Sequence, residues 1–153
     1  MPKLDNINRR ILAILQNDCS ITKADLAREV GLAPASTLER IKKLENNGVI
    51  TGYAALVNHE KVGKPILAIV EITMADHSAA SIKTFQDAVQ KIPEILECYH
   101  VAGEKDFILK IVAADIPDYE RLAVTKIAVI PNIGRVSTMF VLSTKKQLTS
   151  IPM

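Results

Sequence analysis

The chain has 153 residues, a formal net charge of +2, a hydrophobic content of 48% and two cysteines. This composition favours one packed domain or two small ones, and it excludes a strongly basic nucleic-acid-binding protein and a disulfide-rich secreted domain. No apolar run approaches the ~20 residues of a membrane-spanning helix, and the N-terminal segment lacks the apolar core of a secretory signal. We therefore expect a cytoplasmic protein with no membrane partner.

The small positive excess lies in the first third of the chain. Up to Ile50 there are eight basic and six acidic residues, whereas the remainder has eleven of each. An excess of this size attracts DNA only weakly. It suggests that a single copy binds DNA weakly and that function requires several copies.

The first predicted element is a helix over residues 4–17, with Asp5 as its cap. An apolar face recurs at helical spacing and consists of Ile7, Ile11, Ile14 and Leu15. We expect this face to cover the two helices that follow, which gives a three-helix core.

Residues 22–48 predict two short amphipathic helices joined by a tight turn. Thr22 is placed to cap the first helix, Gly31 to end it in the left-handed conformation, and Pro34 to open the second. The expected core positions of the two helices are Leu26, Val30, Leu38, Ile41 and Leu44. Two such helices around a glycine turn form a helix-turn-helix, whose second helix enters the major groove of DNA.

The second helix carries groups suited to DNA on its predicted outer side. The residues at its leading tip are small, and two of them carry hydroxyls that can meet base edges or phosphates; they are Ala35, Ser36 and Thr37. Arg40 is expected to read guanine bidentately, whereas Lys42 and Lys43 are expected to hold phosphates. The same pattern also fits an ordinary helical hairpin with a solvated, charged face.

Gly48 is expected to end this helix. Residues 49–57 have the composition of a strand and predict a short wing that leads into a linker, with Gly63 and Pro65 marking its end. The predicted parts of the chain are a winged helix-turn-helix domain over 1–58, a linker over 59–64 and a second domain over 65–153.

The second domain is predicted to be of the α+β class. Its expected strands cover 65–74, 95–102, 106–113 and 136–144, and its expected helices cover 78–92 and the residues after 115. A weak repeat, with Ala75-Asp76 and Ala114-Asp115 each closing a strand, divides it into two β-α-β halves. Two such halves in tandem give the ferredoxin-like βαββαβ plan with an antiparallel sheet. Because 65–70 is apolar on both sides, we expect the face without helices to pack against a second copy.

Few residues suggest catalysis. No phosphate-binding loop, dinucleotide fingerprint or zinc-protease motif is present. Cys98 and His100 stand two apart on a predicted strand and could form half a metal site or a nucleophile with its base. A small buried cysteine beside a hydrogen-bonded histidine is the commoner arrangement. Glu104 and Asp106 are more simply explained as exposed turn carboxylates, unless a ligand reaches them. We predict a protein that is not an enzyme and that carries no metal and no cofactor.

The segment from Leu26 to Asn58 closely resembles the helix-turn-helix and wing of the leucine-responsive regulator/asparagine regulator (Lrp/AsnC) family. Its sequence is LAREVGLAPASTLERIKKLENNGVITGYAALVN. The second half resembles the effector domain of that family, which is marked by a glycine followed three residues later by an aspartate. Here the motif is VAGEKDFIL, with Gly103 and Asp106. The resemblance covers nearly the whole chain.

This resemblance implies a transcription regulator that dimerises through its sheets, assembles dimers into tetramers or octamers, and binds and bends double-stranded DNA. The family motif carries over to residues 23–42 and adds Lys23 to the DNA-contacting set. Many family members respond to an amino acid bound between dimers. The expected effector contacts are Gly103, Glu104, Asp106, Ile116, Met139, Phe140 and Val141.

In this expected effector site, backbone groups and the Asp106 carboxylate hold the α-amino end of the ligand, while Ile116, Met139 and Phe140 form the side-chain pocket. The alternative is that the same residues form a contact between dimers with no ligand. Lys105, beside the expected pocket, could pair with Asp106 or favour an acidic ligand, and the sequence leaves both open.

The family commonly has serine immediately before the proline of the recognition helix, and this chain has Ala33. The loss of that cap costs ~1 kcal/mol and leaves the start of the helix less fixed. The leading interpretation is a sequence-specific DNA-binding regulator that responds to an amino acid. The alternatives are a ligand-independent architectural DNA-binding protein and a small ferredoxin-like enzyme with an accessory helical domain.

Overall fold

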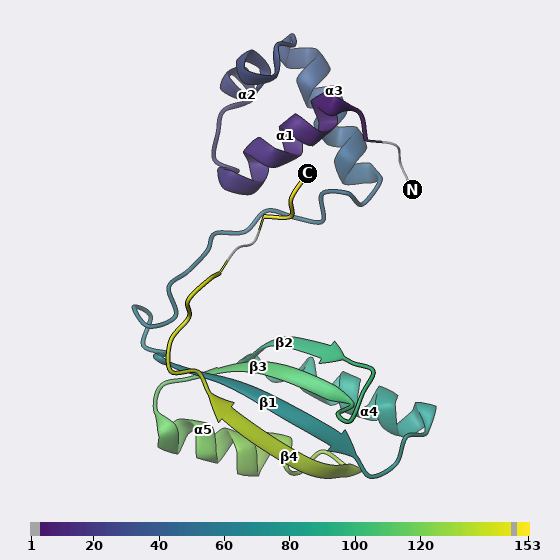
Figure 1. The fold of residues 1–153 in the computed structure, drawn as a ribbon, viewed down its shortest axis with the longest axis vertical. Helices are drawn as coiled ribbons and strands as arrows, with labels where there is room; N and C mark the ends of the chain where they lie inside the picture. Colours follow the sequence, from purple (N-terminus) through teal and green to yellow (C-terminus); the bar gives the residue numbers. More distant parts are fainter. Residues whose placement is uncertain (1–3, 148–149) are drawn as a thin grey trace. The chain divides into compact units, whose positions relative to one another are not determined.

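A computed structural model describes residues 4–147 and 150–153, which form two units. The helical unit contains the chain up to Leu56 together with 145–153, and the sheet unit runs from Val57 to Thr144 (Figure 1). The C-terminal residues were predicted to belong to the sheet domain. In the structure they join the helical unit, because Ile151 forms hydrogen bonds with Gln16 of the first helix.

The helical unit consists of α1 (Asn6–Asn17), α2 (Lys23–Val30) and α3 (Pro34–Asn46). Asp5 caps α1 by accepting from the Asn8 amide at 2.7 Å, and Thr22 caps α2 by accepting from the Asp25 amide at 3.1 Å. Gly31 ends α2 with a φ of 72°, in the left-handed region that favours glycine. These three predicted signals are confirmed.

The core of the helical unit differs from the prediction on α3. The buried positions there are Thr37, Ile41 and Leu44, whereas Leu38 is 39% exposed. Leu38 was the predicted core residue at the start of this helix. In the structure its neighbour Thr37 occupies the core instead. The remaining buried apolar residues of this unit are Ile11, Leu12, Leu15, Leu26, Ala27 and Val30.

The predicted wing over 49–57 is not a strand in the structure. The amides of Val49 and Ile50 both donate to the Leu44 carbonyl and close the end of α3, and residues 51–58 then form no strand. A strand needs a hydrogen-bonded partner, and no described residue of the chain supplies one. Tyr53 and Leu56 are consequently exposed.

The sheet unit has four strands in the order β2-β3-β1-β4, and every neighbouring pair is antiparallel. The elements are β1 (Ile66–Met74), α4 (Ala79–Val89), β2 (Ile95–His100), β3 (Phe107–Ala113), α5 (Ile116–Leu122) with a π-helical turn over Ala123–Ile127, and β4 (Ile133–Phe140). This is the predicted βαββαβ plan. The last strand begins and ends earlier than the predicted 136–144, since its register with β1 runs from Ile133, opposite Met74, to Phe140, opposite Ala68.

One face of the sheet is covered by helices (Figure 1). Alternate residues of the two central strands, such as Val70 and Leu109, are fully buried against Phe85 of α4 and Leu122 of α5. The opposite face holds the intervening residues, and there Leu67 pairs in register with Val112 and Ile69 with Lys110. This second face is mixed in character, because Glu71 and Lys110 stand among its aliphatic residues, and no helix of the described residues covers it.

Candidate DNA-binding helix and effector site

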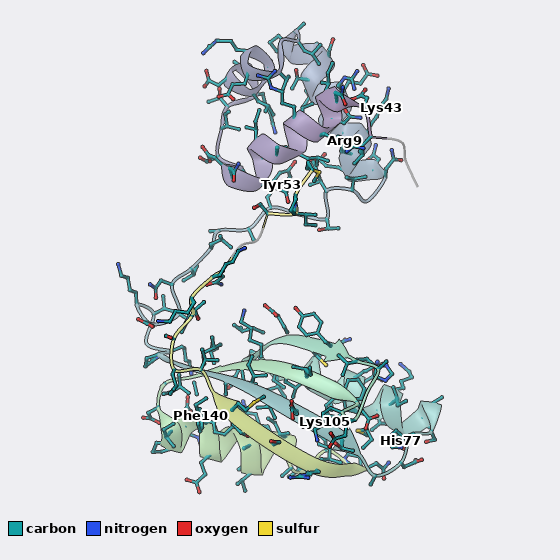
Figure 2. The ribbon with its side chains drawn as sticks, viewed as in Figure 1. Arg9, Lys43, Tyr53, His77, Lys105 and Phe140 are labelled. Carbon is teal, nitrogen blue, oxygen red and sulfur yellow. The ribbon has the colours of Figure 1, made fainter. Side chains whose placement is uncertain are left out.

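The exposed side of α3 carries most of the predicted DNA-contacting residues. Ala35, Ser36 and Lys42 are exposed, and Lys43, exposed as well, forms an ion pair with Glu39 at 3.1 Å. Lys43 is labelled on this unit in Figure 2. Lys23 is exposed at the start of α2. One hydroxyl and three exposed ammonium groups therefore stand on the two helices of the helix-turn-helix, the motif that presents its second helix to DNA.

Thr37 was expected to face DNA, and the structure corrects this. Its side chain is 0% exposed, and its hydroxyl donates to the Ala33 carbonyl at 3.1 Å. A threonine in a helix commonly makes this bond one turn back, which satisfies its hydroxyl inside the protein. Ala33 itself makes no side-chain capping bond, as the sequence predicts, so the tip of α3 is held by Pro34 and by Thr37.

Arg40 was expected to point outward and read guanine, and the structure places it elsewhere. Its Nη1 donates to the Asp5 carboxylate at 2.6 Å and to the Asn8 side-chain oxygen at 3.0 Å, and its side chain is only 32% exposed. The guanidinium therefore joins α3 to the start of α1. Its Nη1 is thereby engaged within the helical unit, by two partners at the start of α1 that spacing along the chain does not reveal.

Leu38 is the residue of this surface that sequence reasoning missed. It is exposed on α3, one turn after Ala35 and one turn before Lys42. An apolar side chain at such a position can contact the methyl group of thymine in the major groove. Leu38 was predicted to be buried because it lies at helical spacing from Ile41. Periodicity alone does not distinguish a residue at the edge of the buried face from one at its centre.

The turn between β2 and β3 contains the glycine–aspartate motif. Gly103 has a φ of 148°, and Asp106, immediately before β3, donates its amide to the Ile72 carbonyl at 2.9 Å. The Asp106 carboxylate accepts from the Met74 amide at 2.7 Å and lies 3.1 Å from His77 Nε2. These contacts fix the carboxylate at the carboxyl end of β1. The backbone amide of Met74, followed by the nearby His77, holds the pKa of Asp106 below its usual value.

His77 lies in the loop after β1, 29 residues before Asp106 in the sequence. It approaches Asp106 only because the loop after β1 returns to the β2–β3 turn, a contact between residues that the sequence spaces far apart. Lys105 does not pair with Asp106, one of the two alternatives that the sequence left open, but with Glu104 at 2.9 Å. Figure 2 shows His77 and Lys105 toward the same end of the sheet.

The other expected effector residues lie at the opposite end of the sheet. Phe140 pairs in register with Ala68 near the start of β1, and its ring meets that of Tyr119 at 5.1 Å in an edge-on arrangement. Ile116, at the start of α5, and Met139, on the uncovered face, are both about half exposed. The Val141 amide donates to the Leu67 carbonyl at 2.8 Å just beyond β4.

The structure therefore divides the expected effector residues into two groups within one subunit. The first group, in the β2–β3 turn, contacts β1 where Asp106 bonds to Ile72. The second group, around Phe140, contacts β1 where Phe140 pairs with Ala68. Four residues of extended strand span ~13 Å. One amino acid cannot reach both groups in a single copy of the chain, as Phe140 and Lys105 in Figure 2 illustrate.

Cys98 and His100 lie on β2 in register with Leu109 and Phe107, and the His100 ring stacks on that of Phe107 at 4.7 Å. In the described part of the chain, no group of three histidine, cysteine or acidic side chains is arranged to hold a metal ion. Within residues 4–147 and 150–153, none of the helices has the length and apolar character needed to cross a membrane.

Comparison with known proteins decides the family. Residues 67–151 match the family described as Lrp/AsnC ligand binding domain, and residues 4–51 match the one described as winged helix-turn-helix DNA-binding. The chain belongs to the Lrp/AsnC family. It is a DNA-binding transcription regulator that joins a helix-turn-helix unit to a ligand-binding domain.

Relatives of this Lrp/AsnC protein match along almost their whole length. The chain is 40% identical to the leucine-responsive regulatory protein of Haemophilus influenzae over 144 residues, which cover 94% of this chain and 87% of that protein. It is 34% identical to the transcriptional regulator AzlB of Bacillus subtilis over 149 residues, which cover 97% and 95% respectively.

Among solved structures, an AsnC family regulator from Agrobacterium tumefaciens matches with a TM-score of 0.91 and 37% identity, covering 97% of each chain. A transcriptional regulator from Neisseria meningitidis, in complex with L-Met, matches with a TM-score of 0.92 and 29% identity, covering 98% of this chain and 97% of that one.

Proposed function

We propose that this regulator binds a specific DNA sequence and responds to an amino acid held between dimers. The observation that carries the proposal is the division of the expected effector residues between the two ends of the sheet. A second subunit that brings its Phe140 end to the Asp106 end of the first would complete a pocket that one copy lacks. The Neisseria relative in complex with L-Met supports an amino acid as the ligand.

Each group of effector residues has a separate role in this proposal. Asp106, together with backbone groups at Gly103 and Glu104, holds the α-ammonium of the ligand. His77 competes for the same carboxylate, so the ligand must displace or share it. Ile116, Met139, Phe140 and Val141, supplied by the other subunit, surround the ligand side chain.

DNA binding is assigned to the exposed side of α3 and the start of α2. Ser36 and Leu38 lie where base edges can be read, whereas Lys23, Lys42 and Lys43 hold phosphates. Two subunits joined through the uncovered face of the sheet present two such helices to one duplex, and further dimers extend the assembly to a tetramer or octamer. We assign the protein no catalytic activity and no cofactor.

The decisive experiment is thermal unfolding with each of the twenty amino acids, including L-methionine. A ligand of the native state raises the midpoint in proportion to the logarithm of its concentration above Kd. Phe140→Ala should abolish the shift, and Val124→Ala, which alters an exposed residue of the π-helical turn, should preserve it. If none of the twenty changes either the midpoint or the sedimentation coefficient, the protein is a ligand-independent architectural DNA-binding protein instead.

A further inference from the structure

The C-terminal tail, residues 150–153, contacts the helical unit through a pair of complementary hydrogen bonds. The Gln16 side chain donates its Nε2 to the Ile151 carbonyl at 3.1 Å, and its Oε1 accepts from the Ile151 amide at 2.6 Å. Both backbone groups of one tail residue are thus satisfied by one side chain of α1. Glutamine is suited to this contact because its amide carries both a donor and an acceptor.

The tail lies along a groove of about 770 Å³ in the helical unit. The groove is lined by the C-terminal end of α1, the turn that follows it, and the extended segment after α3, with Leu12, Leu15, Ile50, Tyr53 and Leu56 as its main apolar residues. Ile151 and Met153 line the same groove. These two side chains remain 70% and 48% exposed, so the tail is held at the groove chiefly by its two hydrogen bonds to Gln16.

Because of the path of the chain, this contact provides a second link between the two units. The chain leaves the helical unit after Leu56, forms the whole sheet unit, and returns at Lys145. The two units are therefore linked by two segments of chain, provided the tail stays docked. A unit held at two points has fewer accessible orientations than one held by a single flexible linker.

We propose that the groove beside Gln16 is the docking surface for the protein's own C-terminal tail, which acts as a second link restraining the DNA-binding unit. The tail continues directly from β4 and Val141, so docking connects the Phe140 end of the sheet to α1. When the tail undocks, only the segment after Leu56 joins the two units, and the DNA-binding unit can take more orientations. More conformational entropy is then lost when two recognition helices bind one duplex.

Cross-linking tests the contact, because native Cys19 is exposed and lines the groove together with Met153. In the full chain with Cys98→Ser, Met153→Cys should form a disulfide with Cys19 within one chain upon mild oxidation. Mass spectrometry and a non-reducing gel identify it. Leu142→Cys is the control, because Leu142 is 98% exposed and belongs to the sheet unit. A disulfide-linked dimer would place the tail of a second copy in the groove, and no disulfide would mean that the tail does not dock; either overturns the proposal.

The functional test compares Gln16→Ala with Asn17→Ala, a neighbouring residue whose side chain bonds to Ala13 of its own helix. Gln16→Ala should speed exchange of the Ile151 amide about tenfold, since the amide loses its acceptor. It should also weaken binding to a DNA with two half-sites by ~5-fold while leaving binding to a single half-site unchanged. Removal of residues 150–153 should reproduce the effect on DNA binding, with circular dichroism showing an intact fold. Wild-type affinity for the paired site in both variants would overturn the restraining role.

Discussion

Arg40 of α3 forms an ion pair with Asp5, the residue that caps α1, with 2.6 Å between Nη1 and Oδ2. One carboxylate thus serves two purposes, because its other oxygen accepts from the Asn8 amide at 2.7 Å. The recognition helix is thereby positioned by a bond to the start of the first helix. The pKa of Asp5 is lowered first by the Asn8 amide and then by Arg40, as expected for a carboxylate that is stabilised in its charged form.

The first prediction concerns this pair. Arg40→Ala should lower the free energy of unfolding by ~0.5–1 kcal/mol, as expected for a partly exposed ion pair. Its effect on DNA binding should be similar for all operator variants, because the guanidinium positions the helix and does not read a base. Chemical denaturation and binding titrations over single-base operator variants measure the two quantities.

Asp5→Asn is the matched control for this prediction, since asparagine still caps α1 but carries no charge. In that background Arg40→Ala should cost less than in the wild type, so the double-mutant cycle should give a coupling energy. A loss of discrimination at one guanine position, with unchanged stability, would instead restore the base-reading role first expected of Arg40.

The second prediction separates base-edge from phosphate contacts on α3. Lys42→Ala should weaken binding to specific and non-specific DNA alike, and it should reduce the slope of log affinity against log salt concentration by about 1, because one phosphate contact is lost. Ser36→Ala should leave that slope unchanged and relax preference at one base pair. Fluorescence anisotropy at several salt concentrations distinguishes the two variants. An unaltered slope for Lys42→Ala would show that this lysine does not contact a DNA phosphate.

The third prediction concerns the turn at Gly103. With a φ of 148°, a side chain at this position is strained whatever space surrounds it. Gly103→Ala should therefore destabilise the sheet unit by ~1 kcal/mol or more. Gly52→Ala, at a position that has open space and no such φ, should change stability by less than about 0.5 kcal/mol. Equal effects of the two substitutions in urea denaturation would contradict the strain argument.

The fourth prediction is a pH dependence at Asp106. The pKa of this carboxyl is lowered from 3.8 in the folded protein, chiefly by the Met74 amide. A lowered folded-state pKa contributes stability that is fully present above the unfolded value and is lost as the pH falls through the folded one. Stability should therefore decline below about pH 4, and Asp106→Asn should make this decline shallower. NMR titration of the Asp106 carboxyl carbon checks the direction, and a midpoint above 3.8 would contradict the assigned contacts.

Much of this protein was determined by short-range rules that are visible in the sequence. The caps at Asp5 and Thr22, the left-handed turn at Gly31 and the β-α-β repeat each depend on residues close together in the chain, so spacing and side-chain chemistry were enough to predict them. The order of helices and strands could be predicted from these local signals. The family resemblance could be stated from the helix-turn-helix segment and the glycine–aspartate motif.

The tertiary structure alone decided where the functional side chains point. Whether Thr37 or Leu38 enters the core depends on a rotation of α3 smaller than the angle between two neighbouring residues, which periodicity does not resolve. The partners of Arg40 and Asp106 come from other elements, and Gln16 meets Ile151 from the far end of the chain. Such contacts require the fold to bring distant segments together, and no local rule in the sequence specifies them.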